Sequence, residues 1–171
     1  MSEPQVEERA ERPYLGIRSE VPTGGIRPVV DRAFPQLFEW LGDHGTQPSG
    51  PPFIRYHELD RAGEPLEIES AVPVADAEAP DEGPVRPGVL PAGRYATLLH
   101  VGPYTHDSVP DLTDAQAALR GWTEEHGIVC SRPSARGESL PCCVEHYRIG
   151  PPMEADWTKW ETELAYLIVE G

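Results

Sequence analysis

The sequence has few cysteines, few basic residues and no long hydrophobic run. Its 171 residues include three Cys and 14 Lys and Arg against 29 Asp and Glu, so the net charge is −15. No segment approaches the ~18 apolar residues that a membrane helix needs, and residues 1–11 lack the basic and apolar parts of a signal peptide. The negative charge also opposes direct binding to nucleic-acid phosphates. We therefore expect a soluble cytoplasmic protein that contacts neither membranes nor nucleic acid.

The cysteines exclude a disulfide framework, because their number is odd and two of them are adjacent. Cys130, Cys142 and Cys143 could form a zinc site only with His126 and His146. Adjacent residues of a strand point to opposite faces, which argues against a metal shared by Cys142 and Cys143. We predict no metal and no cofactor, and we interpret the free cysteines as small buried hydrophobes.

An acidic, proline-rich stretch at 75–87 divides the chain into two halves of similar pattern. Each half has the order strand, helix, strand, strand, at 14–21, 26–42, 53–59 and 66–74 in the first and at 94–101, 111–126, 142–148 and 161–169 in the second. We predict one α+β domain over 12–171 built from two pseudo-symmetric βαββ repeats with antiparallel sheets. Its parts are repeat one (12–74), a linker (75–87) and repeat two (88–170), preceded by a disordered acidic N-terminus (1–11).

The repeat is also visible in individual residues. Both predicted helices end in Trp-x-x-x-His-Gly, once at 40–45 and once at 122–127. Gly45 suits a helix C-terminal cap, and we interpret Trp40 and Trp122 as core residues. Two such repeats bury their sheets only against each other, so we expect them to lie side by side with a ligand groove between them.

The segment LHVGPYTHDSVPDLTDAQAALRGWTEEHG at 99–127 resembles the GyrI-like small-molecule-binding domains, which also occur as effector-binding halves of AraC-type and MerR-type regulators. Gly-Pro-Tyr at 102–104, Glu-x-Tyr at 145–147 and Thr-Glu-Leu at 162–164 follow in the order typical of that family. The resemblance covers residues 12–170. No helix-turn-helix precedes the first strand, so the chain resembles a stand-alone member. We expect a monomer or weak dimer, because the groove needs no second chain and the negative surface opposes self-association.

Glu145 is the first candidate site residue. Strand alternation puts it on one face with Cys143 and Tyr147. A carboxylate in such surroundings would be poorly solvated, so its pKa would rise, and it could attract an organic cation or act as a general acid or base. From the residues alone, an ordinary exposed glutamate is the simpler interpretation. The resemblance implies instead that this position carries the ligand-binding acid.

Aromatic residues supply the rest of the predicted ligand site, because planar ligands stack on rings and cations bind over their faces. Core packing is the alternative for the tryptophans, and a structural corner is the alternative for the tyrosine that follows Gly102-Pro103. The predicted ligand-binding residues are Glu145, Tyr147, Trp160, Trp157, Tyr166, Tyr104 and Tyr56. Glu145 and Tyr147 are the predicted catalytic pair.

The resemblance implies a protein that binds hydrophobic, often cationic, polycyclic compounds. Some stand-alone family members hydrolyse cyclopropane-bearing DNA-alkylating natural products and so protect the cell. In such a reaction Glu145 would activate water and Tyr147 would position the substrate. One alternative is non-catalytic drug binding and sequestration. The other is an acidic inhibitor of DNA gyrase, after which the family is named.

Overall fold

The computed structural model describes residues 3–22, 25–59, 65–79, 83–102, 112–131, 142–149 and 156–170. Its elements follow in the order β1 (Gln5–Arg9), β2 (Arg12–Glu20), α1 (Arg27–Asp43), β3 (Phe53–Leu59), β4 (Pro65–Pro73), β5 (Val85–Leu90), β6 (Gly93–Val101), α2 (Leu112–Glu125), β7 (Val129–Cys130), β8 (Cys143–Ile149), the 3₁₀ helix η1 (Trp157–Lys159) and β9 (Glu161–Glu170).

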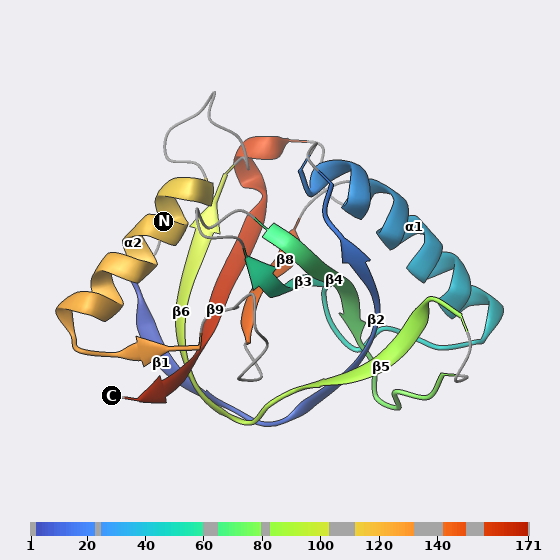
Figure 1. Ribbon diagram of the computed structural model, residues 1–171, viewed down its shortest axis with the longest axis horizontal. Helices are drawn as coiled ribbons and strands as arrows, with labels where there is room; N and C mark the ends of the chain where they lie inside the picture. Colours follow the sequence, from blue (N-terminus) through green and yellow to red (C-terminus); the bar gives the residue numbers. More distant parts are fainter. Residues whose placement is uncertain are drawn as a thin grey trace.

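The strands form one curled antiparallel sheet in the order β1-β6-β9-β8-β3-β4-β2-β5, and the short β7 pairs with β9 beside this path (Figure 1). Each repeat contributes three neighbouring strands, and the two repeats join where β3 pairs with β8. The predicted α+β fold of two βαββ repeats with antiparallel strands is confirmed.

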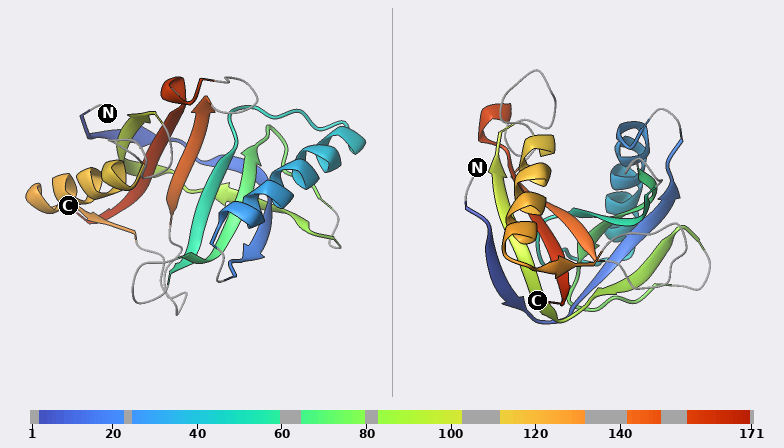
Figure 2. Two further views of the ribbon diagram at one scale, coloured as in Figure 1. Left: turned by 90° about the horizontal axis from the view of Figure 1, so that it is seen from above. Right: turned by 60° about the vertical axis from the view of Figure 1, so that its left-hand side comes forward.

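The two helices cover one face of the sheet, which we call the helix-covered face. In α1 the buried residues recur at helical spacing, at Val29, Ala33, Leu37 and Leu41. In α2, Ala115 and Leu119 pack against Leu98 and Leu164 of the sheet. Figure 2 shows α1 and α2 standing apart, each over the strands of its own repeat. In the described part of the chain, neither helix is long and apolar enough to cross a membrane.

Both helices end in the same local structure, as the repeated Trp-x-x-x-His-Gly motif predicts. The ring of Trp40 stacks on His44 at 3.8 Å between centroids, and that of Trp122 stacks on His126 at 4.4 Å. In each case the histidine Nδ1 lies 2.8 Å from the tryptophan carbonyl oxygen. The glycine that follows, Gly45 or Gly127, has a φ of 65°, which suits a residue without a Cβ.

The outermost strands exchange between the repeats. β1 precedes repeat one but pairs with β6 of repeat two, whereas β5 precedes β6 but pairs with β2 of repeat one. The prediction of a disordered segment at 1–11 was therefore wrong for Gln5–Arg9, and the predicted linker ends earlier than residue 87, since β5 begins at Val85. Composition marks these segments as polar or proline-rich, but the edges of β2 and β6 offer free backbone groups that pair with them.

The opposite face of the sheet, which we call the inner face, curls around a core of its own. This core includes Tyr14, Phe53, Tyr95, Val144 and Ala165, which come from five different strands. β5 approaches it closely through Gly88, where an added Cβ would lie 2.3 Å from the ring of Tyr14. The sheet is thus buried on both sides near its centre.

Candidate functional site

Glu145 lies on the helix-covered face at the junction of the two repeats. It pairs in register with Ile54 of β3, and Tyr56 pairs with Cys143. Tyr56 is two residues beyond Ile54, and Tyr147 is two residues beyond Glu145. Because β3 and β8 are antiparallel, the two tyrosines lie on either side of the carboxylate and face the same way.

The Glu145 side chain is 1% exposed and accepts hydrogen bonds from three donors. Gln116 Nε2 of α2 donates to Oε1 at 2.6 Å, and the Tyr147 hydroxyl donates to Oε2 at 3.0 Å. The Tyr56 hydroxyl is the third donor. Burial raises the pKa of Glu145, and these hydrogen bonds offset only part of that effect.

Such a carboxyl group can bind a cation or exchange a proton. Its burial disfavours the charged form, and a cation brought into contact with it would restore the lost electrostatic stabilisation. A raised pKa also brings a carboxyl group closer to the range in which general acid–base catalysis is efficient at neutral pH. We call Glu145, Gln116, Tyr56 and Tyr147 the Glu145 cluster.

A series of aromatic rings leads from the Glu145 cluster to the surface of α1. The ring of Phe34 meets Tyr147 edge to face at 6.5 Å between centroids, and it stacks on Phe38 at the same distance. The side chain of Phe38 is 42% exposed. On the side of repeat two, Tyr166 pairs with Cys143. The pKa of the Tyr166 hydroxyl is raised, mainly because the group is buried and also because Glu145 lies nearby.

In the part of the chain that the structure describes, two buried hydroxyl groups on this face have no hydrogen-bond partner. Ser70 Oγ belongs to the residue opposite Ile54, and Thr162 Oγ1 to the residue opposite Tyr147. Both residues are 0% exposed. Buried hydroxyls are usually paired, so these two are free to accept a hydrogen bond from a polar group that enters beside the Glu145 cluster.

The predicted site residues have different locations. Tyr56, Tyr147 and Tyr166 lie close to Glu145. Trp160 is half-buried just before β9, two residues from Thr162. Trp157 lies in η1, where its side chain is outside the described residues, and Tyr104 is outside them entirely.

Sequence reasoning missed Phe34 and Gln116. Phe34 follows Ala33 within the apolar period of α1, so its ring could have been noticed as a candidate. Gln116 stands between two alanines and carries no signal of function. Only the packing of α2 against repeat two brings its amide to Glu145.

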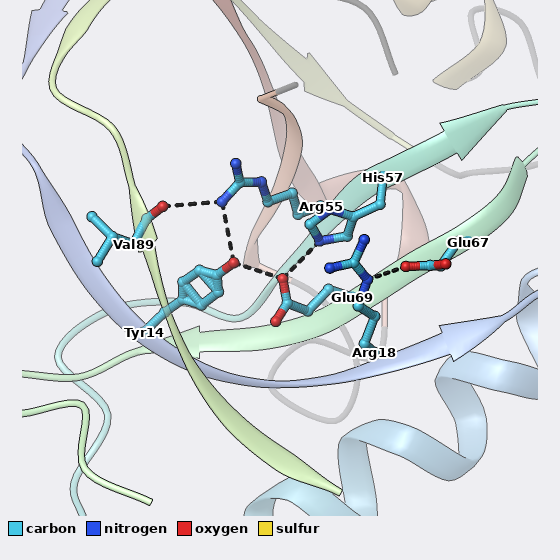
Figure 3. Close-up of polar contacts among 7 residues, drawn as sticks. All are labelled: Tyr14, Arg18, Arg55, His57, Glu67, Glu69 and Val89. Carbon is cyan, nitrogen blue, oxygen red and sulfur yellow. Dashed lines mark hydrogen bonds and ion pairs between the residues drawn. The ribbon is translucent and has the colours of Figure 1, made fainter. Parts of the chain in front are cut away.

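A second polar cluster lies on the inner face (Figure 3). Glu69 Oε1 accepts hydrogen bonds from the Tyr14 hydroxyl at 2.6 Å and from His57 Nε2 at 2.8 Å. Arg55 donates to the same Tyr14 hydroxyl at 3.1 Å and to the carbonyl oxygen of Val89 in β5 at 3.0 Å. Burial alone would raise the pKa of Glu69, but the hydrogen bonds from His57 and Tyr14 outweigh it, and the pKa is lowered. This closed network joins β2, β3, β4 and β5.

Metal binding would require several His, Cys, Asp or Glu side chains to lie close together. Within the ranges that the structure covers, no three His, Cys, Asp or Glu side chains come close enough together to hold a metal ion. The thiols of Cys142 and Cys143 are both buried.

The sequence matches the model of the GyrI-like small molecule binding domain over residues 2–163. No curated protein sequence is a significant match. Among solved structures, EcmrR in complex with DNA is 23% identical with a TM-score of 0.78, and the match covers 97% of this chain but only 57% of that one. The C-terminal domain of EcmrR alone is 21% identical with a TM-score of 0.73, over 99% of this chain and 98% of that domain.

Two more distant structures share the fold. A hydrolase from Listeria innocua is 16% identical with a TM-score of 0.62, over 97% of this chain and 91% of that one. SAV2435 bound to tetraphenylphosphonium is 12% identical with a TM-score of 0.54, over 98% of this chain and 94% of that one. The family match extends over nearly the whole chain, and the two βαββ repeats agree with it. The chain belongs to the GyrI-like small-molecule-binding domain family.

Proposed function

We propose that this protein binds hydrophobic, often cationic, polycyclic compounds at the Glu145 cluster. The observation that carries the proposal is the carboxylate of Glu145, which is 1% exposed and, among the described residues, lies beside tyrosine hydroxyls and a glutamine amide rather than beside a basic side chain. A buried carboxylate without a cationic partner costs folding free energy. A ligand cation would supply that partner, and the rings of Phe34, Tyr56 and Tyr147 would contact its apolar body.

The relationship to SAV2435, solved with the lipophilic cation tetraphenylphosphonium, supports this ligand class. A cation at Oε1 of Glu145 would lie next to the amide of Gln116, which donates to that oxygen at 2.6 Å. Ser70 and Thr162 would offer their unpaired hydroxyls to polar groups of the ligand.

Hydrolysis of cyclopropane-bearing alkylating compounds is a second proposed activity of the same cluster. It is favoured by the raised pKa of Glu145 and by the adjacent Tyr147 hydroxyl, and a structural neighbour described as a hydrolase is consistent with it. In this reaction the oxygen of water bonds to a ring carbon while a C–C bond of the cyclopropane breaks. The electron pair passes into the conjugated carbonyl group, Glu145 accepts the proton of water, and that proton then neutralises the product.

Binding is tested by titrating tetraphenylphosphonium into the wild type and into Glu145→Gln. The affinity should fall by about 1–2 kcal/mol in the variant, the range for a desolvated cation's favourable contacts. Glu39→Gln is the matched control, because Glu39 is exposed on α1 and its replacement changes the net charge equally. Equal affinity in all three proteins would reject the assignment of Glu145.

Turnover is tested separately, with limiting protein and an excess of a cyclopropane-bearing alkylator. Continued product formation by the wild type and its loss in Glu145→Gln would support hydrolysis. Consumption of a single equivalent would leave sequestration as the function. A protein that does neither, but binds DNA gyrase with a steep dependence on salt, would instead use its acidic surface.

A further inference from the structure

The inner face shows a difference between the two repeats that bears on ligand binding. Arg55 pairs with Glu69 in repeat one, and His146 pairs with Glu163 at the equivalent position in repeat two. Tyr14 and Tyr95 occupy equivalent places on β2 and β6, the first strand of each repeat, and both belong to the inner core. The two halves of the inner face can therefore be compared residue by residue.

In repeat one the side chains at these positions pack against one another. Arg55 and Glu69 are 6% and 5% exposed, and they form the closed network with Tyr14 and His57 (Figure 3). In repeat two the equivalent positions surround a cavity of about 560 Å³ instead. The cavity lining includes Tyr95, Val144, His146, Arg148 and Glu163 together with the segment that connects β1 to β2. A volume of this size fits a small organic molecule.

The charges around this cavity favour an anion. Arg9, Arg12 and Arg148 all line it, although the chain as a whole carries a net charge of −15. Arg9 is neutralised by Glu163, at 2.6 Å between Nη2 and Oε1, and by Glu7 at 2.8 Å. In the ranges covered by the structure, neither Arg12 nor Arg148 forms an ion pair, and Arg12 makes only a long hydrogen bond, 3.4 Å, to the carbonyl oxygen of Ser49.

The pKa of His146 is also affected by these positive charges. This residue is 6% exposed, and its pKa is lowered to about 3, first by burial and then by Arg9, Arg12 and Arg148. The acidic groups at the cavity are Glu163, which is paired with Arg9, and Glu11, which is exposed. Leu90, Tyr95 and Val144 provide an apolar wall next to these charges.

We propose that the inner-face cavity of repeat two is a second ligand site, which takes a small amphipathic anion: one carboxylate, sulfonate or phosphate group on an apolar ring. Arg12 and Arg148 hold the anionic group, and the ring lies against Leu90, Tyr95 and Val144. Arginine suits this role because its planar group donates two parallel hydrogen bonds to such anions. This site lies on the opposite face of β8 from Glu145, so it is separate from the proposed cation site.

The test is a fluorescence titration with 8-anilinonaphthalene-1-sulfonate, an aromatic sulfonate, on the folded full chain. Replacing both Arg12 and Arg148 with Gln should weaken binding about tenfold, the effect of losing roughly 1.4 kcal/mol of charged hydrogen bonding. Inorganic sulfate should compete with the dye more strongly than chloride at the same ionic strength. In the wild type, sulfate should also move the ring NMR signals of His146 but not those of His44 and His126, which lie at the helix ends.

The control variant replaces Arg32 and Arg94 with Gln, since both are exposed and the change in net charge is identical. Equal loss in both double variants would mean that only the overall charge matters and would overturn the proposal. Dye binding that depends on Glu145 rather than on the arginines, or unmoved His146 signals, would overturn it as well. If the double variant does not fold, Arg148→Gln alone is used, because Arg148 is exposed near the end of β8, and about a threefold loss is expected.

Discussion

Glu145 and His146 are consecutive residues of β8 whose side chains lie on opposite faces of the sheet, and both are buried. Burial raises the pKa of Glu145 and lowers that of His146 to about 3. Both shifts favour the neutral form of the side chain. Because β8 is a central strand covered on both faces, a charge on either residue is poorly solvated, and both residues should make folding depend on pH.

Glu145→Gln should stabilise the protein above the pKa of Glu145. The native state holds the proton to a higher pH than the unfolded state, so the wild type loses stability as the pH rises from the ordinary glutamate value through the raised one. Glutamine does not titrate. The gain in the free energy of unfolding should be about 1 kcal/mol at pH 8 and smaller at pH 4, as measured by urea denaturation. A gain that is the same at both pH values would contradict this prediction.

The proposed cation affinity should rise with pH over the same range. Only the ionised form of Glu145 attracts a cation, and its raised pKa leaves a protonated fraction at pH values where an exposed glutamate is fully charged. Isothermal titrations of tetraphenylphosphonium at pH 5, 6, 7 and 8 measure this dependence. Glu145→Gln should show a flat profile, and a flat profile in the wild type would argue against Glu145 as the counter-charge.

His146→Gln should reduce the sensitivity of the protein to acid. The pKa of His146 falls from 6.5 to about 3 on folding, so the unfolded state takes up a proton first and stability is lost as the pH falls from 6.5 through 3. Between pH 6.5 and 4 this loss amounts to about 3 kcal/mol. The variant should lack that part of the slope in urea denaturation. His44→Gln, at an exposed position, is the control for the loss of a histidine.

Gly88→Ala should destabilise the protein through the contact between β5 and Tyr14. The added methyl group would lie 2.3 Å from the ring of Tyr14, which cannot move without disturbing its 2.6 Å hydrogen bond to Glu69. We expect a loss of about 1–3 kcal/mol, the usual effect of overpacking. Gly121→Ala is the control: its Cβ meets no atom within 4 Å, and in helix α2 the change should stabilise by about 0.5–1 kcal/mol.

Phe34→Leu should weaken binding of an aromatic cation if α1 forms one wall of the proposed site. Phe34 touches Tyr147, which itself donates to Glu145. Loss of one aromatic contact should cost about 0.5–1.5 kcal/mol, or up to roughly tenfold in affinity for tetraphenylphosphonium. Trp122→Phe, at the far end of α2, should leave the affinity unchanged. A larger loss of affinity in Trp122→Phe than in Phe34→Leu would show that α1 does not form a wall of the site.

Local patterns in the sequence were enough to predict both helices and the three strands of each repeat, but not β1, β5 or β7. Helical spacing of apolar residues predicts α1 at 26–42, and the structure has it at Arg27–Asp43. Strand alternation predicts β8 and β9, and it puts Glu145 and Tyr147 on one face. These features depend only on residues close in the chain, because side-chain direction repeats every 3.6 residues in a helix and every two in a strand.

Tertiary structure decided which of these elements meet. β1 pairs with the edge of β6 in repeat two, and β5 pairs with the edge of β2 in repeat one. The sequence of neither segment indicates which strand it pairs with. Gln116 reaches Glu145 only through the packing of α2, and Tyr56 only through the register of β3 on β8. On the inner face, equivalent positions form a closed network around Arg55 in repeat one and line a cavity beside His146 in repeat two. The sequence does not predict this difference, because burial and charge pairing depend on side chains that lie far apart in the chain.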